Sequence, residues 1–261
     1  MLQHHKNTIQ KITNKLKARE DILAILVCGS IAHGFETTAS DVDLMLVISD
    51  SEHKKRSKTG DIHYFETESC TYENGYIDGK YISRVFMKEV AEKGSEPARF
   101  AFKGSFATYS SIEDISGLIK KITRYPVEKK NENIARFYAQ FEAWKWYCEE
   151  ALKQNNLYLL NHSISNFVLF SGRLILATNE TLYPYHKWFL KVLDQVKEKP
   201  HGLMETIQKL LKEPTQEHIS KLYHLIKEFR NWEFSEHQWP VLFMKDSELN
   251  WLNGCVPVAD L

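Results

Sequence analysis

The residues best suited to chemistry lie between positions 27 and 48, in the segment VCGSIAHGFETTASDVDLMLVI. An apolar run leads into Gly29-Ser30, and after ten further residues Asp41 and Asp43 stand at the start of the next apolar run. Alternate residues of a strand project to the same face, so the two carboxylates are predicted to project together. Neighbouring carboxylates repel each other unless a cation is present, and their hard oxygen atoms suit Mg²⁺. The pair therefore predicts a magnesium site.

The Gly29-Ser30 pair is predicted to bind phosphate. Gly29 allows the backbone to come close to a ligand, and Ser30 adds a hydroxyl beside free backbone N–H groups where a helix begins. Each feature alone is common, because a Gly-Ser pair often marks only a tight turn and an Asp-x-Asp pair often lies at a solvated strand edge. Joined at this spacing between two apolar strands, they indicate a site for a metal-bound nucleoside triphosphate.

Gly29-Ser30, ten intervening residues and Asp41-Val42-Asp43 together resemble the motif of the DNA polymerase β-like nucleotidyltransferase superfamily. The resemblance is greatest to its small bacterial members, such as the aminoglycoside and lincosamide nucleotidyltransferases. It implies two Mg²⁺ ions, a nucleoside triphosphate donor, transfer of the nucleoside monophosphate to an acceptor hydroxyl, and release of pyrophosphate. It also implies that Asp41 and Asp43 hold the metal ions while Gly29 and Ser30 cradle the triphosphate.

The superfamily usually supplies a third carboxylate from a later strand, and the candidate here is Asp78 in GYIDGKYISRVF (75–86). A charge inside an apolar strand pattern needs a reason. Asp78 is therefore predicted to complete the metal site or to act as the general base that takes the acceptor's proton. The alternative is an edge-strand carboxylate paired with Lys80. Glu66 and Glu68 on the preceding strand are the fallback candidates, and alternation puts both on one face.

Other cationic groups carry weaker indications. The segment YPYHKWF (183–189) contains a Pro-x-x-Lys-Trp stretch similar to one in related nucleotidyltransferases, so Lys187 is predicted to reach the triphosphate or the acceptor. The alternative is a surface lysine whose stem packs beside the tryptophan. His33 either steers the triphosphate or is a partly exposed loop histidine. Arg99 and Lys103 either touch phosphate or belong to a solvated face.

Strands and helices must position these groups, and hydrophobic periodicity predicts where they are. Up to residue 126, we expect helices over 3–18, 30–36 and 115–122, with further helical character from Arg99 onward, and buried strands over 22–28 and 41–49. Residues 61–87 are expected to form a hairpin with a tight two-residue turn at Asn74-Gly75.

After residue 126 the pattern is helical, with segments at 131–154, 157–178, 185–198, 203–212 and 216–232. The first of these is dense in aromatic residues, which are typical of a bundle core and, as the alternative, of a base-stacking platform. The predicted fold class is α+β. A mixed-sheet nucleotidyltransferase catalytic domain (1–126) is followed by a helical bundle domain (127–261).

The composition limits which binding partners and which cellular compartment we expect for the protein. Lys plus Arg and Asp plus Glu both number 34, which gives a formal net charge of zero. This balance argues against nucleic acid as the acceptor and against a polybasic membrane anchor. No apolar run is long enough to cross a bilayer, and the Lys-rich N-terminus has no apolar signal core. Cys28, Cys70, Cys148 and Cys255 lack paired spacing, which is typical of reduced thiols in the cytoplasm.

The sequence thus predicts a Mg²⁺-dependent nucleotidyltransferase that modifies a hydroxyl of an acceptor, expected to be a small molecule. A protein acceptor stays open, as does the choice between ATP, GTP and other donors. The alternative is a catalytically silent, nucleotide-binding regulatory or antitoxin-like module that engages a protein partner. The direction of the Asp78 side chain relative to Asp41 and Asp43 distinguishes the two, because catalysis needs all three acids on one side.

Overall fold

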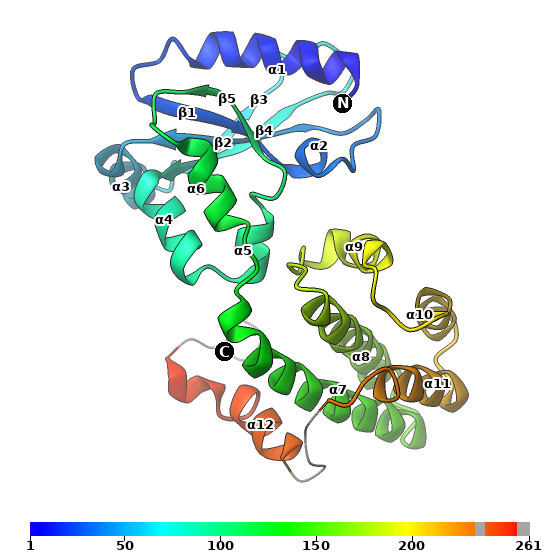
Figure 1. Cartoon of the computed structure of the whole chain (residues 1–261). Coiled ribbons are helices and arrows are strands. Elements are labelled where there is room, and N and C mark those ends of the chain that lie inside the picture. Colours follow the sequence, from blue (N-terminus) through cyan, green and yellow to red (C-terminus); the bar gives the residue numbers. More distant parts are fainter. Residues whose placement is uncertain (233–237, 255–261) are drawn as a thin grey trace. The chain divides into compact units, whose positions relative to one another are not determined.

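In the computed structural model, which describes residues 1–232 and 238–254, the chain divides into two units, Met1–Arg124 and Tyr125–Leu261. The first unit has the element order α1 (Gln3–Leu16), β1 (Ile22–Val27), α2 (Gly29–His33), β2 (Val42–Ile48), α3 (Asp50–Thr59), β3 (His63–Glu66), β4 (Ile77–Ser83), α4 (Arg84–Lys93), α5 (Glu96–Phe100), β5 (Phe106–Ser110) and α6 (Ile115–Ile122) (Figure 1). The mixed sheet of this unit, followed by an all-helical second unit, confirms the predicted α+β fold class.

The five strands of the first unit form one mixed sheet in the order β3-β4-β2-β1-β5. β2 and β4 run parallel, while the other neighbouring pairs are antiparallel. β1 and β2 are buried along almost their whole length, which explains their near-continuous apolar sequences. β3 and β5 are the edge strands.

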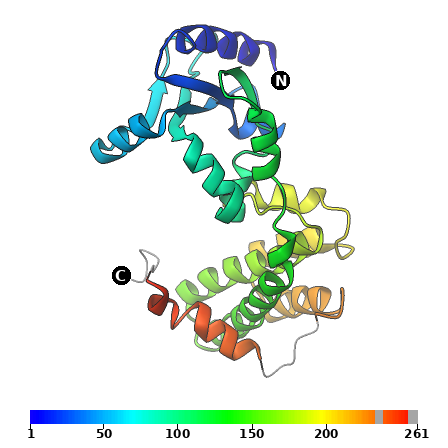
Figure 2. The ribbon, with the colours of Figure 1, turned by 60° about the vertical axis from the view of Figure 1, so that its left-hand side comes forward.

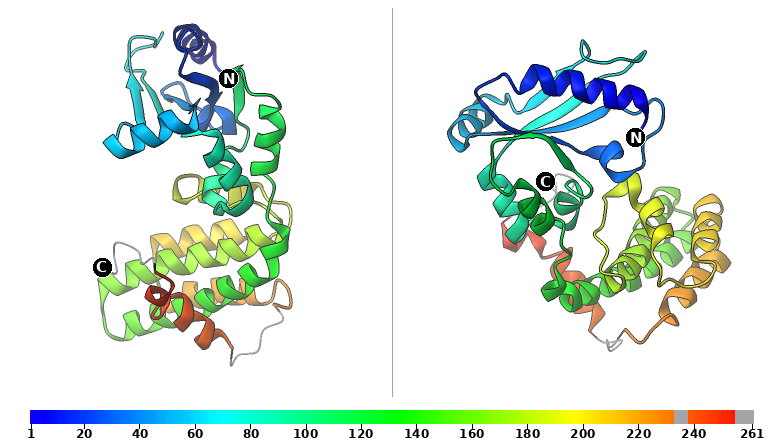
Figure 3. Two further views of the ribbon diagram at one scale, coloured as in Figure 1. Left: turned by 90° about the vertical axis from the view of Figure 1, so that its left-hand side faces the viewer. Right: turned by 45° about the horizontal axis from the view of Figure 1, so that its top comes forward.

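Helices cover both faces of this sheet (Figure 1 and the right view of Figure 3). α1 lies along one face, where Ile12 and Leu16 pack with Leu44 and Ile77 in one core. α4 and α6 cover the other face, whose core includes Met45. Consecutive residues of β2 therefore belong to two different cores, as alternation along a strand demands.

The predicted hairpin is present, but its tight turn at Asn74-Gly75 is wrong. The pairing of β3 with β4 ends at Glu66 and Ile77, so the connection spans residues 67–76. Asn74 does adopt a positive φ of 57°, but the Tyr72 ring fills the space beside Gly75 inside a longer loop. The strand also ends earlier than expected. Ser83 accepts a hydrogen bond from the Phe86 N–H and caps α4, so the helix begins where the predicted hairpin still continued.

The second unit consists of η1 (Val127–Lys129), α7 (Lys130–Lys153), α8 (Leu157–Thr178), η2 (His186–Trp188), α9 (Phe189–Gln195), α10 (Leu203–Lys212), α11 (Gln216–Lys227), α12 (Trp239–Asp246) and η3 (Asn250–Asn253). α7 and α8 run side by side over most of their lengths (Figure 2). Phe141 of α7 is fully buried and stacks on Phe167 and on Tyr223, with ring centroids 5.2 and 5.4 Å apart. Phe141 therefore belongs to the core of the helical bundle, whereas Trp146 of the same helix is half-exposed.

One helical prediction in the second unit needs correction, and one helix was missed. The helix expected over 185–198 begins only after Tyr185, because this residue adopts a positive φ of 66° that a helix cannot contain, and it consists of η2 and the short α9, with non-helical dihedral angles at Trp188 where the two join. α12 was not predicted, and Arg136 of α7 donates hydrogen bonds of 2.8 and 2.9 Å to Asp246 at its end. Within the described residues, no helix combines the length and the apolar character that crossing a membrane requires. Cys28, Cys70 and Cys148 are free thiols, and Cys255 lies outside the described residues.

Candidate active site

The end of β1 is joined to the start of β2 at the centre of the sheet. The Cys28 N–H donates a hydrogen bond of 2.9 Å to the Asp43 carbonyl, and Gly29 follows with a φ of +62°. A Cβ atom at position 29 would overlap with the carboxylate of Asp43. Only glycine satisfies both the left-handed backbone and this close approach. Gly29 therefore lets the Asp43 carboxylate lie directly against the turn.

Ser30 is the second residue of α2 and is buried. Its hydroxyl oxygen has no hydrogen-bond partner among the described residues of the chain. A buried polar group without a partner is costly, and such groups are uncommon in native proteins. The hydroxyl beside the Gly29 turn is therefore suited to a ligand oxygen, as the sequence predicted for phosphate.

Asp43 and Asp78 are directly opposite each other on the parallel strands β2 and β4. Paired residues on neighbouring strands project to the same face, so both carboxylates lie on the side covered by α4 and α6. Asp41 stands one residue before β2 and is half-buried, like the other two acids. The three acids come from two adjacent strand starts at one end of the sheet.

The charges of all three acids shift the pKa values of two neighbouring side chains. The charge of Asp41 and a hydrogen bond with it raise the pKa of Tyr76, and the charges of Asp43 and Asp78 raise it further. Burial raises the pKa of the Cys28 thiol, and Asp43, Asp78 and Asp41 add to this effect while Lys80 opposes it. One phenol and one thiol thus lie within electrostatic reach of all three predicted acids, at the end of the sheet where β2 and β4 begin.

Asp78 has a partner that the sequence reasoning missed. His63 Nε2 lies 2.6 Å from Asp78 Oδ1, so the structure pairs Asp78 with His63 rather than with Lys80. His63 and Phe65 lie two residues apart on β3, so their side chains project to the same face. Phe65 is opposite Asp78, and His63 therefore reaches Asp78 diagonally across the strand pair. The histidine side chain is 66% exposed. Once the hairpin register is known, the period of two along β3 identifies this contact.

The acid group provides suitable ligands for Mg²⁺, but it is not a closed metal centre. Nowhere in residues 1–232 and 238–254 do three His, Cys, Asp or Glu side chains converge closely enough to hold a metal ion. Like charges keep carboxylates apart, and they approach a common point only around a cation. The donor set of carboxylate oxygens is the one that Mg²⁺ prefers when it shares its coordination with substrate phosphates. The Gly29 turn and the Ser30 hydroxyl next to it suit those phosphates.

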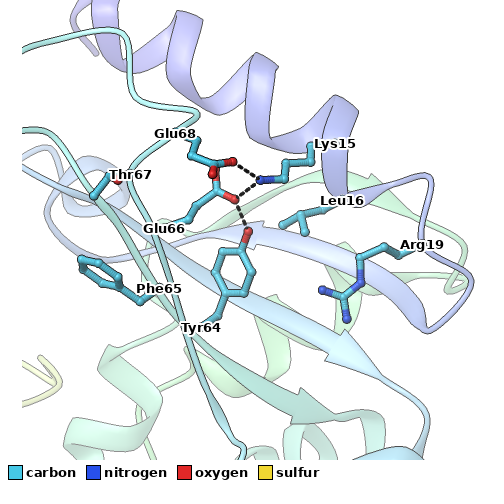
Figure 4. A pocket seen from close by; sticks show the side chains of 8 residues that line it. All are labelled: Lys15, Leu16, Arg19, Tyr64, Phe65, Glu66, Thr67 and Glu68. Carbon is cyan, nitrogen blue, oxygen red and sulfur yellow. Dashed lines mark hydrogen bonds and ion pairs between the residues drawn. The ribbon is translucent and has the colours of Figure 1, made fainter.

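The fallback candidates Glu66 and Glu68 are on the wrong side of the sheet to complete this group. Glu66 is opposite Ile77, whose side chain belongs to the core under α1, so Glu66 projects away from the face of Asp78. Both glutamates line a groove of about 600 Å³ beside α1 and contact Lys15 there (Figure 4). Glu68 moreover lies beyond the end of β3.

Two other candidates have structural roles. Arg99 is 5% exposed and donates hydrogen bonds to the carbonyls of Gly94, Ile122, Ala91 and Glu92, so neither the phosphate contact nor the solvated face predicted for it is correct. His33 Nδ1 lies 2.8 Å from the Lys103 carbonyl, and its ring packs on Phe100. Burial lowers the pKa of His33, and the charge of Lys103 acts in the same direction. These contacts fix α2 against the segment after α5.

Lys187, the predicted triphosphate contact from the helical part, belongs to η2 in the second unit. Its side chain is exposed, and its ammonium lies 5.2 Å from the centre of the Trp188 ring. Its role toward the triphosphate stays a prediction.

The loop that leads into Asp41 is held by groups that the sequence did not reveal. His5 Nε2 lies 3.0 Å from the Ser40 carbonyl, and the Tyr72 hydroxyl donates to the same oxygen over 2.7 Å. A carbonyl oxygen only accepts, so the Nε2 atom of His5 carries the proton. His5 is fully buried, and burial lowers its pKa, with His4 adding to the effect. No spacing rule connects positions 5 and 72 to position 40, which is why sequence patterns could not find them.

Comparison with known proteins finds a family match within the first unit. Residues 10–95 match the model of the family described as Polymerase beta, Nucleotidyltransferase. A crystal structure of a nucleotidyltransferase-like protein from Exiguobacterium sibiricum 255-15 has 12% sequence identity and a TM-score of 0.48, over 96% of this chain and 87% of that one. No curated protein sequence matches the chain. The family match covers both Gly29-Ser30 and the three acids.

Proposed function

We propose that this member of the DNA polymerase β-like nucleotidyltransferase superfamily transfers a nucleoside monophosphate from a Mg²⁺-bound nucleoside triphosphate to a hydroxyl of a small acceptor. The chain is a nucleotidyltransferase by family, and the proposal concerns its metal, its donor and its acceptor. The observation that carries it is the contact of Asp43 with the Gly29 turn, because it puts a metal-binding carboxylate against a phosphate-binding turn.

Each residue of the site has a role in this proposal. Asp41, Asp43 and Asp78 would hold Mg²⁺, which when bound stabilises the charge on the attacking and leaving oxygens. Ser30 donates its hydroxyl proton to a phosphate oxygen, and Gly29 keeps the turn free of a side chain that would block it. These contacts place the α-phosphorus in front of the acids, and placement of this kind supplies much of the rate enhancement.

The transfer itself needs one proton acceptor. The acceptor oxygen forms a bond to the α-phosphorus, the bond from that phosphorus to the bridging oxygen breaks, and pyrophosphate leaves with the electron pair. The hydroxyl proton goes to a base, for which Asp78 is the candidate because it is half-exposed and its partner His63 is exposed to solvent. Asp78 serves either as this base or as a metal ligand.

The position of Asp78 supports catalysis over a silent nucleotide-binding module. Its side chain projects to the same face as that of Asp43 because the two residues are paired in register. A module that only binds nucleotide has no need of a third carboxylate at this point. Triphosphate binding without turnover in the wild-type protein would favour the silent module instead.

The proposal is tested by calorimetry of the full chain with ATP and with GTP, each in MgCl₂ and in EDTA. We expect at least one triphosphate to bind in Mg²⁺ and not in EDTA, and we expect Asp43→Asn to lower that affinity by at least about 100-fold, since a metal-held charge contributes several kcal/mol. Asp61→Asn is the matched control, because Asp61 is an exposed acid that pairs with Arg56 away from the Gly29 turn. The affinity of this variant for the triphosphate should equal that of the wild type. Equal affinities of Asp43→Asn and wild type would contradict the proposal.

A further inference from the structure

The main chain directly before Asp41 is held by two donors from distant parts of the sequence. The Ser40 carbonyl accepts one hydrogen bond from His5 Nε2 over 3.0 Å and another from the Tyr72 hydroxyl over 2.7 Å. His5 is fully buried, and Tyr72 is half-buried. A carbonyl oxygen has two lone pairs, and both are used here. The peptide group that leads into Asp41 is therefore fixed by side chains rather than by the sheet.

The peptide group on the other side of Asp41 is fixed as well. The Val42 N–H donates a hydrogen bond of 3.1 Å to the Tyr76 carbonyl. Tyr72 and Tyr76 both belong to the connection of residues 67–76, and Asp78 follows two residues later on β4. Asp41 thus lies between two anchored peptide groups, and both anchors come from the segment that leads to Asp78.

The start of α1 holds this segment and the loop before Asp41 together. In Figures 1 and 3 the N-terminus of α1 lies at the end of the sheet that carries α2. His4 Nε2 lies 3.2 Å from the Thr38 carbonyl, and the Thr71 hydroxyl donates to the His4 carbonyl over 2.9 Å. The rings of His4 and His5 pack on the Tyr72 ring, with centroids 4.6 and 5.3 Å apart. Three segments far apart in the sequence are therefore joined beside Asp41.

Both donors to the Ser40 carbonyl are neutral groups. Burial lowers the pKa of His5, and burial raises the pKa of Tyr72 to about 12, with the charges of Cys70 and Asp41 adding to the effect. Near neutral pH the imidazole is therefore uncharged and the phenol keeps its proton. These hydrogen bonds fix the main chain without adding a positive charge beside Asp41, so the carboxylate keeps its full charge for a cation.

We propose that His5 and Tyr72 are positioning residues for Asp41. They fix its main chain so that its carboxylate meets the metal ion together with Asp43 and Asp78. The inference rests on the proposed function and assigns to it two residues that act through the carbonyl before Asp41. Groups that orient a metal ligand contribute to metal affinity although they do not touch the ion, and small misplacements at a reacting centre are costly.

The test measures, by calorimetry of the full chain, the free Mg²⁺ concentration at which binding of a non-hydrolysable ATP or GTP analogue is half-maximal. His5→Leu removes one donor, whereas His5→Gln keeps an amide N–H near the position of Nε2. Tyr72→Phe removes the other donor and keeps the ring. Thr13→Val is the matched control, because the buried Thr13 hydroxyl also lies on α1 but donates to Thr108 of β5 over 2.8 Å.

We expect His5→Leu to raise this Mg²⁺ concentration about tenfold, the lower end of the losses seen when a group that orients a metal ligand is removed. Tyr72→Phe should raise it about threefold, because one hydrogen bond between neutral groups is lost while the other donor remains. His5→Gln should stay within about twofold of the wild type, since its amide replaces the donor. Thr13→Val should keep the Mg²⁺ requirement of the wild type, although thermal melts should show that it is destabilised.

An unchanged Mg²⁺ requirement in either His5→Leu or Tyr72→Phe would overturn the inference. An equal increase in Thr13→Val would also overturn it, because a general loss of stability would then explain the effect. An increase in His5→Gln as large as in His5→Leu would show that the hydrogen bond has no role. If His5→Leu does not fold, the comparison of Tyr72→Phe with the wild type decides alone. All these outcomes leave the proposed function intact, whereas absence of Mg²⁺-dependent binding in the wild type would reject that function and the inference with it.

Discussion

The sheet of the first unit carries acids on both of its faces, and the two groups differ in what compensates them. On the α1 face, the Lys15 ammonium lies 2.6 Å from Glu66 Oε2, and the Tyr64 hydroxyl donates to the same oxygen over 2.7 Å. The Ser69 N–H donates to the other oxygen of Glu66. The carboxylate is surrounded by permanent donors from the chain itself (Figure 4).

On the opposite face, the partners of the acids are of another kind. Asp78 is paired with an exposed imidazole, the charge of Asp41 raises the pKa of Tyr76, and the Asp43 carboxylate lies against the backbone of Gly29. The imidazole is not a permanent cation like the lysine on the other face. Lys80 lies within electrostatic reach on this face, but Asp78 pairs with His63 instead. The comparison teaches that an acid with a dedicated lysine stabilises the fold, whereas grouped acids with weak donors are suited to a cation that arrives with a substrate.

The largest effect is expected when one carboxylate on each face is replaced by its neutral amide. Asp78→Asn should lower the rate of nucleotidyl transfer by at least about 100-fold, the scale of a lost general base or metal ligand, and leave the melting temperature close to that of the wild type. Glu66→Gln should leave transfer within about twofold and lower the free energy of unfolding by about 1 kcal/mol. Steady-state rates and thermal melts of both variants give the comparison. Equal losses of rate would show that the two faces do not differ in function.

The two glycines around α2 offer a second matched pair. Gly29→Ala should lower transfer by about 10- to 100-fold, because its Cβ would displace the Asp43 carboxylate and small misplacements at a reacting centre are costly. Gly34 has a similar φ of +70°, but no other atom lies within 4 Å of the point that a Cβ would occupy there. Gly34→Ala should therefore cost only backbone strain of about 1 kcal/mol.

Transfer rates and urea unfolding of the two glycine variants separate displacement from strain. If Gly34→Ala loses as much rate as Gly29→Ala, backbone strain alone explains both, and the contact with Asp43 has no role. If Gly29→Ala keeps full rate, the turn does not position the acid.

Sequence patterns predicted most of the central sheet and the motif residues. The apolar runs at 22–28 and 41–49 were confirmed as β1 and β2, because runs this short and rich in β-branched residues favour a strand buried on both faces over a helix. Helices 115–122 and 203–212 were found with their bounds, since each has a clear apolar face. The family to which the chain was assigned from Gly29-Ser30 and Asp41-Val42-Asp43 was also confirmed.

The features that sequence patterns missed depend on pairing between distant segments. Glu66 and Asp78 both alternate with apolar residues, and only the register of β3 on β4 puts them on opposite faces. Arg99 looked like a surface cation because nothing in its neighbourhood marks the four carbonyls that it binds in the fold. Short strands such as β5 were missed for a related reason, because an exposed edge strand has little apolar pattern.

The smallest expected effect is the pH dependence of the stability that Glu66 contributes on the α1 face. Burial raises the pKa of Glu66, but the hydrogen bonds from Lys15, the Ser69 N–H and Tyr64 outweigh it, so that its pKa is lowered overall. A carboxyl whose pKa is lower in the folded than in the unfolded state stabilises the fold above its unfolded pKa, near 4.3, and this contribution is lost as the pH falls through the folded pKa. The difference in unfolding free energy between wild type and Glu66→Gln should therefore be about 1 kcal/mol at pH 7 and shrink below about pH 4.

Urea unfolding at pH 7 and pH 3.5 measures this difference, and Lys15→Met is the matched variant, because it removes the cation and leaves the carboxylate. Lys15→Met should be destabilised at pH 7 and approach the wild type as the pH falls through the lowered pKa of Glu66, as Glu66→Gln does, since a protonated carboxyl no longer needs its ammonium partner. A difference that is constant between the two pH values would show that Glu66 contributes by packing alone. In that case the contrast between a lysine-compensated face and a substrate-facing one would depend only on the transfer rates of Asp78→Asn.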